Sequence, residues 1–64
     1  MKFEIFAKGD PTVGDGDHHA TVDIPFMVTG DKEYGLFVVA QLESAFSDIF
    51  DSRAKVVKVD GVTR

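Results

Sequence analysis

Two acidic residues and two adjacent histidines lie close together near the start of the chain, at Asp15, Asp17, His18 and His19. Carboxylate and imidazole groups are common zinc ligands. A calcium loop counted from Asp15 would need glycine at its sixth position and glutamate at its twelfth, where this chain has Ala20 and Phe26. Neighbouring residues of an extended segment point to opposite faces, so His18 and His19 converge on one ion only if the backbone kinks. We therefore interpret residues 10–19 as a polar connecting loop and keep a metal site on these four residues as an alternative.

Other catalytic chemistry finds little support. The chain has no cysteine, which excludes disulfides and thiolate zinc sites. Ser44, Ser47 and Ser52 lie on or just after a predicted helix, where serine is usually solvated, and the fold would have to bring His18 or His19 to one of them. The two glycine-rich phosphate-binding motifs, GxGxxG and GxxxxGK(S/T), are both absent from the sequence. We expect no catalytic residues, no cofactor and no enzymatic activity.

Charge is distributed unevenly along the 64 residues, whose formal net charge is −4. Residues 10–51 carry nine acidic residues against one base, Lys32, whereas the two flanks are basic. A nucleic-acid-binding surface needs several cations on one face. The pattern argues against direct nucleic-acid binding, which stays a weaker alternative through four flanking lysines: Lys2, Lys8, Lys55 and Lys58.

Hydrophobic periodicity predicts three strands and one helix. Alternation of apolar and polar residues indicates strands at 2–8, 20–29 and 54–59, the last closed by the turn pair Asp60-Gly61. Pro25 lacks an N–H group, which puts the second strand at a sheet edge or at a bulge. Residues 31–51 follow helical spacing, although Gly35 and Val38-Val39 weaken its first part. The alternative is a hairpin turn at Gly30-Asp31 followed by a strand at 33–39.

The predicted fold is a single α+β domain over residues 1–64, with order β-β-α-β and a three-stranded, mostly antiparallel sheet covered by one helix on one face. The alternative helix start would make it β-β-β-α-β. The strands are expected to bury one apolar face: Phe3, Ile5, Val22, Ile24, Phe26, Val28, Val57 and Val59. The helix is expected to bury a matching stripe: Tyr34, Val38, Leu42, Ala45, Phe46 and Ile49.

Apolar residues exceed what this core needs. Phe6, Met27 and Val56 are predicted on the outer sheet face, and Leu36, Phe37 and Ala40 off the buried stripe of the helix. A cluster of exposed apolar residues is typical of a protein interface, and a domain this small has little stability to spare. We therefore predict a homodimer and a partner-binding surface that joins apolar and acidic residues: Glu33, Glu43, Asp48, Asp51, Leu36, Phe37, Phe6 and Met27.

These observations together predict a non-enzymatic protein-interaction domain whose acidic centre contacts a basic protein surface, as an inhibitor or decoy of a nucleic-acid-processing protein would. In element order, size and charge the chain resembles small viral inhibitors of DNA-repair enzymes, without a shared motif; the resemblance implies a possible viral source. The sequence shows no signal peptide and no apolar run of membrane-spanning length. A cytoplasmic, membrane-independent protein is expected.

Overall fold

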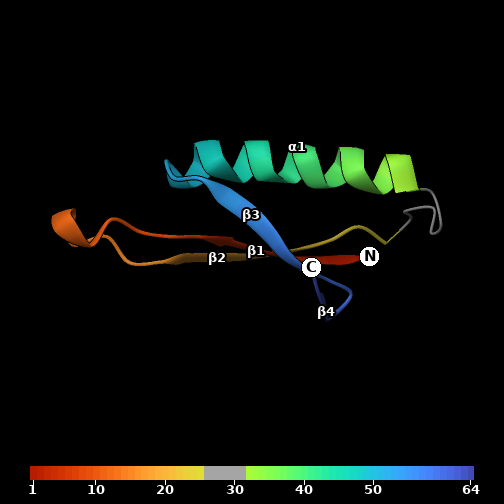
Figure 1. Cartoon of the computed structure of the whole chain (residues 1–64), viewed down its shortest axis with the longest axis horizontal. Coiled ribbons are helices and arrows are strands. Elements are labelled where there is room, and N and C mark those ends of the chain that lie inside the picture. The colour runs from red at the N-terminus through yellow and green to blue at the C-terminus, as the bar shows by residue number, and fades with distance from the viewer. Residues whose placement is uncertain (26–31) are drawn as a thin grey trace.

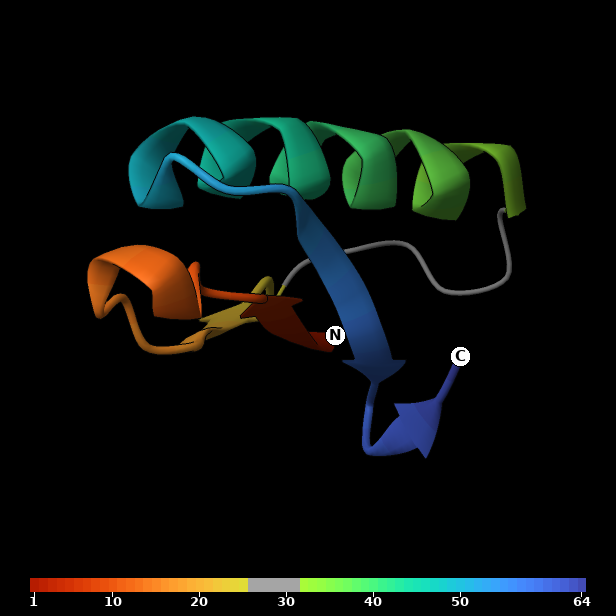
Figure 2. The ribbon, with the colours of Figure 1, turned by 60° about the vertical axis from the view of Figure 1, so that its left-hand side comes forward.

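The computed structural model describes residues 1–25 and 32–64, except for the side chains of residues 32–34. One helix, α1 (Lys32–Phe50), lies across one face of a four-stranded antiparallel sheet (Figures 1 and 2). The strands are β1 (Lys2–Ala7), β2 (His18–Asp23), β3 (Ala54–Val59) and β4 (Val62–Thr63), in the spatial order β2-β1-β3-β4. The predicted two-layer α+β fold is confirmed, with one short strand more than expected. Residues 33–39 belong to the helix, so the alternative strand does not form.

The β1–β2 hairpin is the longest pairing of the sheet. Lys2 lies opposite Asp23, and the regular register continues to Ala7 opposite His18. Every second side chain of β1 faces α1 and is buried, whereas the others lie on the outer face. Beyond the end of β2, Ile24 still exchanges two backbone hydrogen bonds of 2.8 Å with Met1. The strand predicted at 20–29 starts two residues earlier, at His18 in the predicted loop, and ends at Asp23, before the turn at Pro25. The rest of the predicted strand, with Phe26 and Val28 in the core, lies outside the described residues.

The predicted buried face of β3 is wrong, because the strand contains a bulge. Phe3 pairs with Val59, and Ile5 pairs with Val56, so that β3 has one more residue than β1 between these pairs. The extra residue bends the strand and reverses which side chains face the helix. Val56 is therefore buried, at 4% exposure, and Val57 is 37% exposed. The alternation in the sequence had suggested the opposite assignment.

The buried stripe of α1 differs in part from the predicted one. Val39 is buried, and four apolar neighbours on the same side are partly buried: Val38, Leu42, Phe46 and Phe50. Ala45 and Ile49, both predicted in the core, are exposed. Phe46, also predicted in the core, is partly buried there, and the position of α1 above β1 and β3 places Phe50 in the core in place of Ile49. The side chain of Tyr34 lies outside the described part of the chain.

Two turns fix the ends of the last elements. At the end of α1, Asp51 adopts φ 50°, and the N–H of Ser52 donates to the carbonyl of Ser47 at 3.2 Å. This 6→1 bond is typical of a Schellman motif, which usually has glycine at the left-handed position. Between β3 and β4, Asp60 and Gly61 both have positive φ, as a type I′ hairpin turn requires. The predicted Asp-Gly turn is thus confirmed.

Candidate functional site

The loop between β1 and β2 is held by a capped 3-10 helix, η1 (Pro11–Val13). Oδ1 of Asp10 accepts hydrogen bonds from the Thr12 hydroxyl at 2.6 Å and from the Thr12 backbone N–H at 2.9 Å. The hydroxyl is the larger of the two influences that hold the pKa of the Asp10 carboxyl below its usual value. Gly14 closes the turn with φ 75°. Asp10 therefore has a structural role in this polar loop, as the cap of η1.

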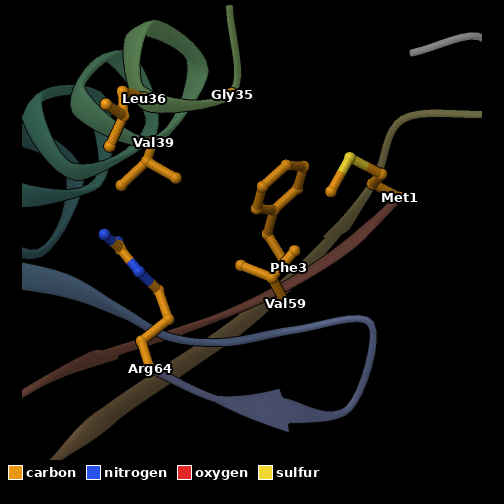
Figure 3. Close-up of a pocket in the computed structure, with 7 residues that line it drawn as sticks. All are labelled: Met1, Phe3, Gly35, Leu36, Val39, Val59 and Arg64. Atoms are coloured by element: carbon orange, nitrogen blue, oxygen red, sulfur yellow. The ribbon is translucent and has the colours of Figure 1, made fainter. Parts of the chain in front are cut away.

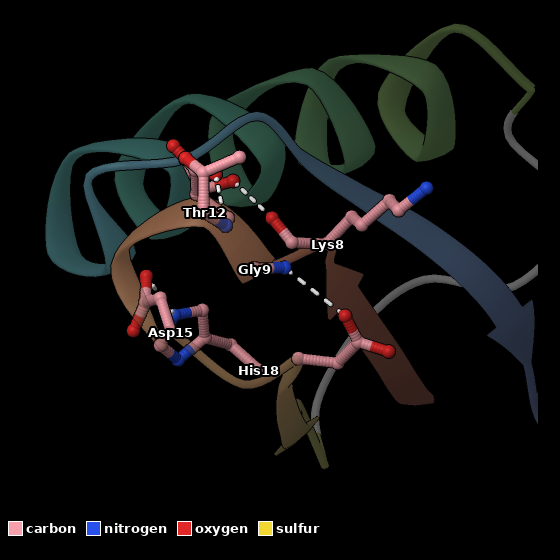
Figure 4. Close-up of polar contacts among 8 residues, drawn as sticks. Lys8, Gly9, Thr12, Asp15 and His18 are labelled. Atoms are coloured by element: carbon pink, nitrogen blue, oxygen red, sulfur yellow. Dashed lines mark hydrogen bonds and ion pairs between the residues drawn. The ribbon is translucent and has the colours of Figure 1, made fainter.

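Two further hydrogen bonds tie the ends of the loop to the rest of the domain (Figure 4). The N–H of Gly9 donates to Oδ1 of Asp17 at 3.0 Å, and the Ser52 hydroxyl donates to the carbonyl of Lys8 at 2.6 Å. A side chain at position 9 would overlap the carbonyl oxygen of Gly16, so the close approach of these two segments requires glycine there. Ser52, expected to be solvated, instead connects the end of α1 to the end of β1.

The four residues of the metal-site alternative do not form one site. Nε2 of His18 lies 3.5 Å from Oδ2 of Asp15, a distance that allows an ion pair when the imidazole is protonated but is long for a hydrogen bond. His18 stacks on Phe50 beneath the helix, whereas His19 makes an edge contact with Phe6 on the outer sheet face. Asp17 is engaged by Gly9. Among the described residues, no three His, Asp or Glu side chains are grouped so that they could hold a metal ion.

The side chain of Glu43, predicted to bind a partner, makes a contact inside the domain. Its Oε2 accepts a hydrogen bond of 2.9 Å from the backbone N–H of Val56 on β3. One turn further along α1, the Ser47 hydroxyl donates to the carbonyl of Glu43 and accepts from the N–H of Ala54 at 2.8 Å. These helix side chains cover backbone donors on β3 that pair with none of the described strands. Glu43 is therefore part of the scaffold.

The outer face of α1 places an exposed aromatic side chain in line with an acid. Phe37 is 60% exposed and lies nearly opposite the buried Val39 on the helix. Asp48 follows Phe37 by three turns, so the two lie on one face about 16 Å apart along the axis. Asp51 follows the end of the same helix and is exposed. Of the predicted partner-binding residues, Phe37 and Asp48 therefore share the helix face opposite Val39, and Asp51 lies just beyond the end of the helix.

Leu36 lies beside a different feature, a cavity of about 290 Å³ between the first turns of α1 and the sheet. Its described lining is apolar except for one cation (Figure 3): Met1, Phe3, Gly35, Leu36, Val39, Val59 and Arg64. The guanidinium of Arg64 points from the sheet side toward the helix. Leu36 is 62% exposed, so the cavity is open at this rim. Nothing in the sequence pattern had singled out Arg64, because only the fold brings the last residue under the helix.

The outer sheet face mixes apolar and charged groups around Phe6. This side chain is half-buried, with its ring centroid 5.3 Å from that of His19, and it lines a depression of about 380 Å³. Lys58 lies opposite Glu4, and Lys2 lies opposite Asp23. Each of these two lysines therefore has an acid across the strand pair, which interrupts the row of cations that the nucleic-acid alternative requires.

The remaining predicted partner-binding positions are Met27, which lies outside the described residues, and Glu33, whose side chain does. No protein-family model matches the chain, and no curated protein or solved structure shows significant similarity to it. In the described part of the chain, no helix combines the length and the apolar character that crossing a membrane requires.

Proposed function

We propose that the protein is a non-enzymatic, acidic interaction domain that binds a basic surface of a protein partner through the outer face of α1. The observation that carries this proposal is the exposed Phe37 in line with Asp48 on the face opposite the buried Val39. An exposed aromatic side chain is a frequent anchor of protein interfaces. Carboxylates around such an anchor favour a cationic partner and speed its association.

The position of the acids on α1 supports a role in binding. The carboxyl end of a helix carries a partial negative charge, so cations there stabilise the helix and anions destabilise it. Residues 47–50, the last turn, contain no base, and they are followed directly by Asp51. Asp48 and Asp51 therefore lie where they oppose helix stability, and local violations of this kind tend to occur at functional sites.

A basic groove made for nucleic acid is the partner class that we favour. A compact acidic domain with net charge −4 presents carboxylates to such a groove as phosphates would. The proposal includes action as an inhibitor or decoy in the cytoplasm, and in the host cytoplasm if the source is viral. Small viral inhibitors of DNA-repair enzymes, which the chain resembles in element order and charge, act on targets of this class.

The test is binding to a panel of purified DNA-processing enzymes with basic grooves, followed by surface plasmon resonance at low and high salt. We expect at least one enzyme to bind and to lose activity, with an association rate that falls as salt rises. Asp48→Lys should slow this association, whereas Phe37→Ala should speed dissociation. Asp15→Lys makes the same charge change in the β1–β2 loop and should have a much smaller effect.

Two results would overturn the proposal. One is the absence of binding to every enzyme of the panel at low salt. The other is binding that is insensitive to salt and equal in the wild type, Asp48→Lys and Phe37→Ala. The second result would move the partner surface away from α1.

A further inference from the structure

We infer that β2 pairs antiparallel with β2 of a second copy of this chain, joining two four-stranded sheets into one continuous sheet about a two-fold axis. The partner proposed above contacts α1, whereas this interface uses the opposite margin of the molecule, at the free edge of the sheet. The inference does not rest on that proposal, and either can fail while the other holds.

The outer edge of β2 carries backbone groups without a strand partner. Met1 and Ile24 exchange two hydrogen bonds, and bonded pairs alternate along an antiparallel ladder. The residues of β2 that bond to β1 are therefore His18, Ala20 and Val22, whereas the backbone groups of His19, Thr21 and Asp23 point outward. The carbonyl of Lys2, opposite Asp23, bonds in the other direction to the N–H of Asp60 at 2.8 Å, which confirms this alternation. Within the described residues β2 pairs with β1 alone.

The two edges of the sheet differ in how far their backbone groups are covered. At the β3 side, Glu43 and Ser47 cover backbone donors, Val57 forms a bulge, and β4 pairs with the end of the strand. Covering, bulging and short edge strands are the usual means by which proteins prevent edge-to-edge association. β2 has regular register over its whole length and contains no proline and no lysine. The six residues of β2 therefore lack the bulge, proline and lysine that protect sheet edges, and Pro25 follows only two residues after the end of the strand.

Side-chain complementarity favours one register. With Thr21 opposite its own copy, His19 lies opposite Asp23 of the second copy, and the pair occurs twice. A register centred on Ala20 would instead place Asp23 opposite Asp17, two like charges. One centred on Val22 would place His19 opposite Pro25, which cannot donate a hydrogen bond. All three registers join outward-facing backbone groups; of the three, the register centred on Thr21 sets His19 opposite a carboxylate and places no like charges opposite each other.

The helix-facing side of β2 supports the same arrangement. α1 packs above β3 and β1, so Ala20, Val22 and Ile24 are only partly buried. In the register centred on Thr21, Ala20 lies opposite Val22 of the second copy, and the reverse pair follows by symmetry. Pairing at the edge thus brings these half-covered apolar side chains into contact across the two-fold axis.

The experiment measures the dimer dissociation constant by sedimentation equilibrium, with circular dichroism to verify folding. Thr21→Pro removes an outward N–H that makes no bond to β1, and Thr21→Val is the matched control that keeps it. We expect the wild type and Thr21→Val to dimerise, and Thr21→Pro to weaken the dimer by about tenfold or more, because both interchain bonds donated by residue 21 are lost.

Variants with altered charges at positions 19 and 23 provide a second test if Thr21→Pro does not fold. In the proposed register, His19→Asp sets carboxylates opposite each other, and His19→Lys combined with Asp23→Lys sets ammonium groups opposite each other. Each variant alone should be a monomer of about half the wild-type mass, and an equimolar mixture should form a dimer. A wild type that stays a 7.0 kDa monomer at high concentration, or charge variants that dimerise alone as well as together, would overturn the inference.

Discussion

At the scale of single residues, Asp51 adopts a backbone conformation that its side chain disfavours. It occupies the left-handed position after α1 with φ 50°, where a residue with a Cβ atom is destabilised by roughly 1–2 kcal/mol and glycine is the usual choice. Its carboxylate also lies at the negative end of the helix. Both terms oppose stability, which is consistent with the role that we propose for Asp51 in binding.

We therefore expect Asp51→Gly to raise the melting temperature by about 4–8 °C, the shift that roughly 1 kcal/mol produces in a domain of this size. Differential scanning calorimetry measures the change. Asp51→Asn removes the charge and keeps a side chain of the same size at the left-handed position, so it separates the charge term from the conformational term. An Asp51→Gly protein no more stable than Asp51→Asn would refute the conformational argument.

A second residue-scale prediction concerns the cap of η1. The Thr12 hydroxyl and then the Thr12 N–H lower the pKa of Asp10 from its ordinary value of 3.8. A carboxyl whose pKa is lower in the folded state stabilises the fold above its unfolded pKa, and this contribution is lost as the pH falls through the folded pKa. The pH window of this effect therefore lies at and below about pH 4.

Thr12→Ala should raise the pKa of Asp10 toward the ordinary value without restoring it fully, because the backbone N–H still donates. Carboxyl carbon chemical shifts, followed by NMR during an acid titration, report this pKa directly. Thr12→Ser keeps the hydroxyl and should behave as the wild type. Equal pKa values in Thr12→Ala and Thr12→Ser would show that the hydroxyl does not act on Asp10.

At the scale of elements, the contact between α1 and the margin of β3 explains why an acid lies half-buried in the middle of the helix. Glu43 accepts from the N–H of Val56, a donor that none of the strands in the described part of the chain pairs. Glu43→Ala should leave this donor without its partner and lower the free energy of unfolding by about 1–3 kcal/mol. Glu43→Gln keeps an acceptor oxygen and should lose less.

Urea unfolding measures the stability of these Glu43 variants, and amide hydrogen exchange at Val56 shows where the effect arises. Exchange at this amide should accelerate in Glu43→Ala more than at other amides of β3. A Glu43→Ala protein with wild-type stability and unchanged exchange would mean that the contact adds nothing to the fold.

The bulge in β3 leads to a prediction about two adjacent valines, because the sequence pattern and the structure disagree on which of them is buried. The alternation in the sequence placed Val57 in the core and Val56 outside, whereas the structure buries Val56. Val56→Asp should unfold the domain, because an unpaired buried charge is strongly destabilising. Val57→Asp should remain folded, as circular dichroism and NMR spectra would show. The reverse outcome would restore the regular register.

At the scale of the whole molecule, the core is small. The described buried apolar residues number six: Phe3, Ile5, Ala7, Val39, Ala54 and Val56. The molecule measures 42 by 19 by 18 Å, and its radius of gyration is 12.6 Å, compared with roughly 11 Å for a compact domain of this length. The loop that carries η1 extends past the end of α1 (Figure 1), and the helix-facing apolar side chains of β2 are only partly buried. A second copy paired at the edge of β2 would contact these side chains.

Coupling between folding and dimerisation then makes the melting temperature rise with protein concentration. Phe37→Asp should preserve this dependence, because Phe37 lies on α1, away from the free edge of β2. Thermal melts of both proteins over a wide concentration range measure the effect. A melting temperature that depends on concentration in the wild type and not in a folded Phe37→Asp variant would place the interface on the helix, where the apolar excess of the sequence had suggested it.

The sequence by itself determined the local features of this protein. Period-two alternation specified the location of β1 and β3, helical spacing specified α1, and Asp60-Gly61 specified the hairpin turn. Pro25 indicated that the second strand lies at a sheet edge, and β2 is at the edge. These features follow from backbone geometry and side-chain size, which act over a few residues.

Only the tertiary structure decided which member of each adjacent apolar pair is buried. Val56 or Val57, and Ile49 or Phe50, satisfy the same local pattern, and the choice depends on the bulge in β3 and on how α1 lies above it. The candidate sites also depend on the packing of distant segments. Glu43 meets Val56, and Arg64 reaches the cavity under α1, only because segments distant in sequence pack together. Non-local packing of this kind leaves no period in the sequence, so the fold had to be seen before the outer face of α1 and the free edge of β2 could be distinguished from the scaffold.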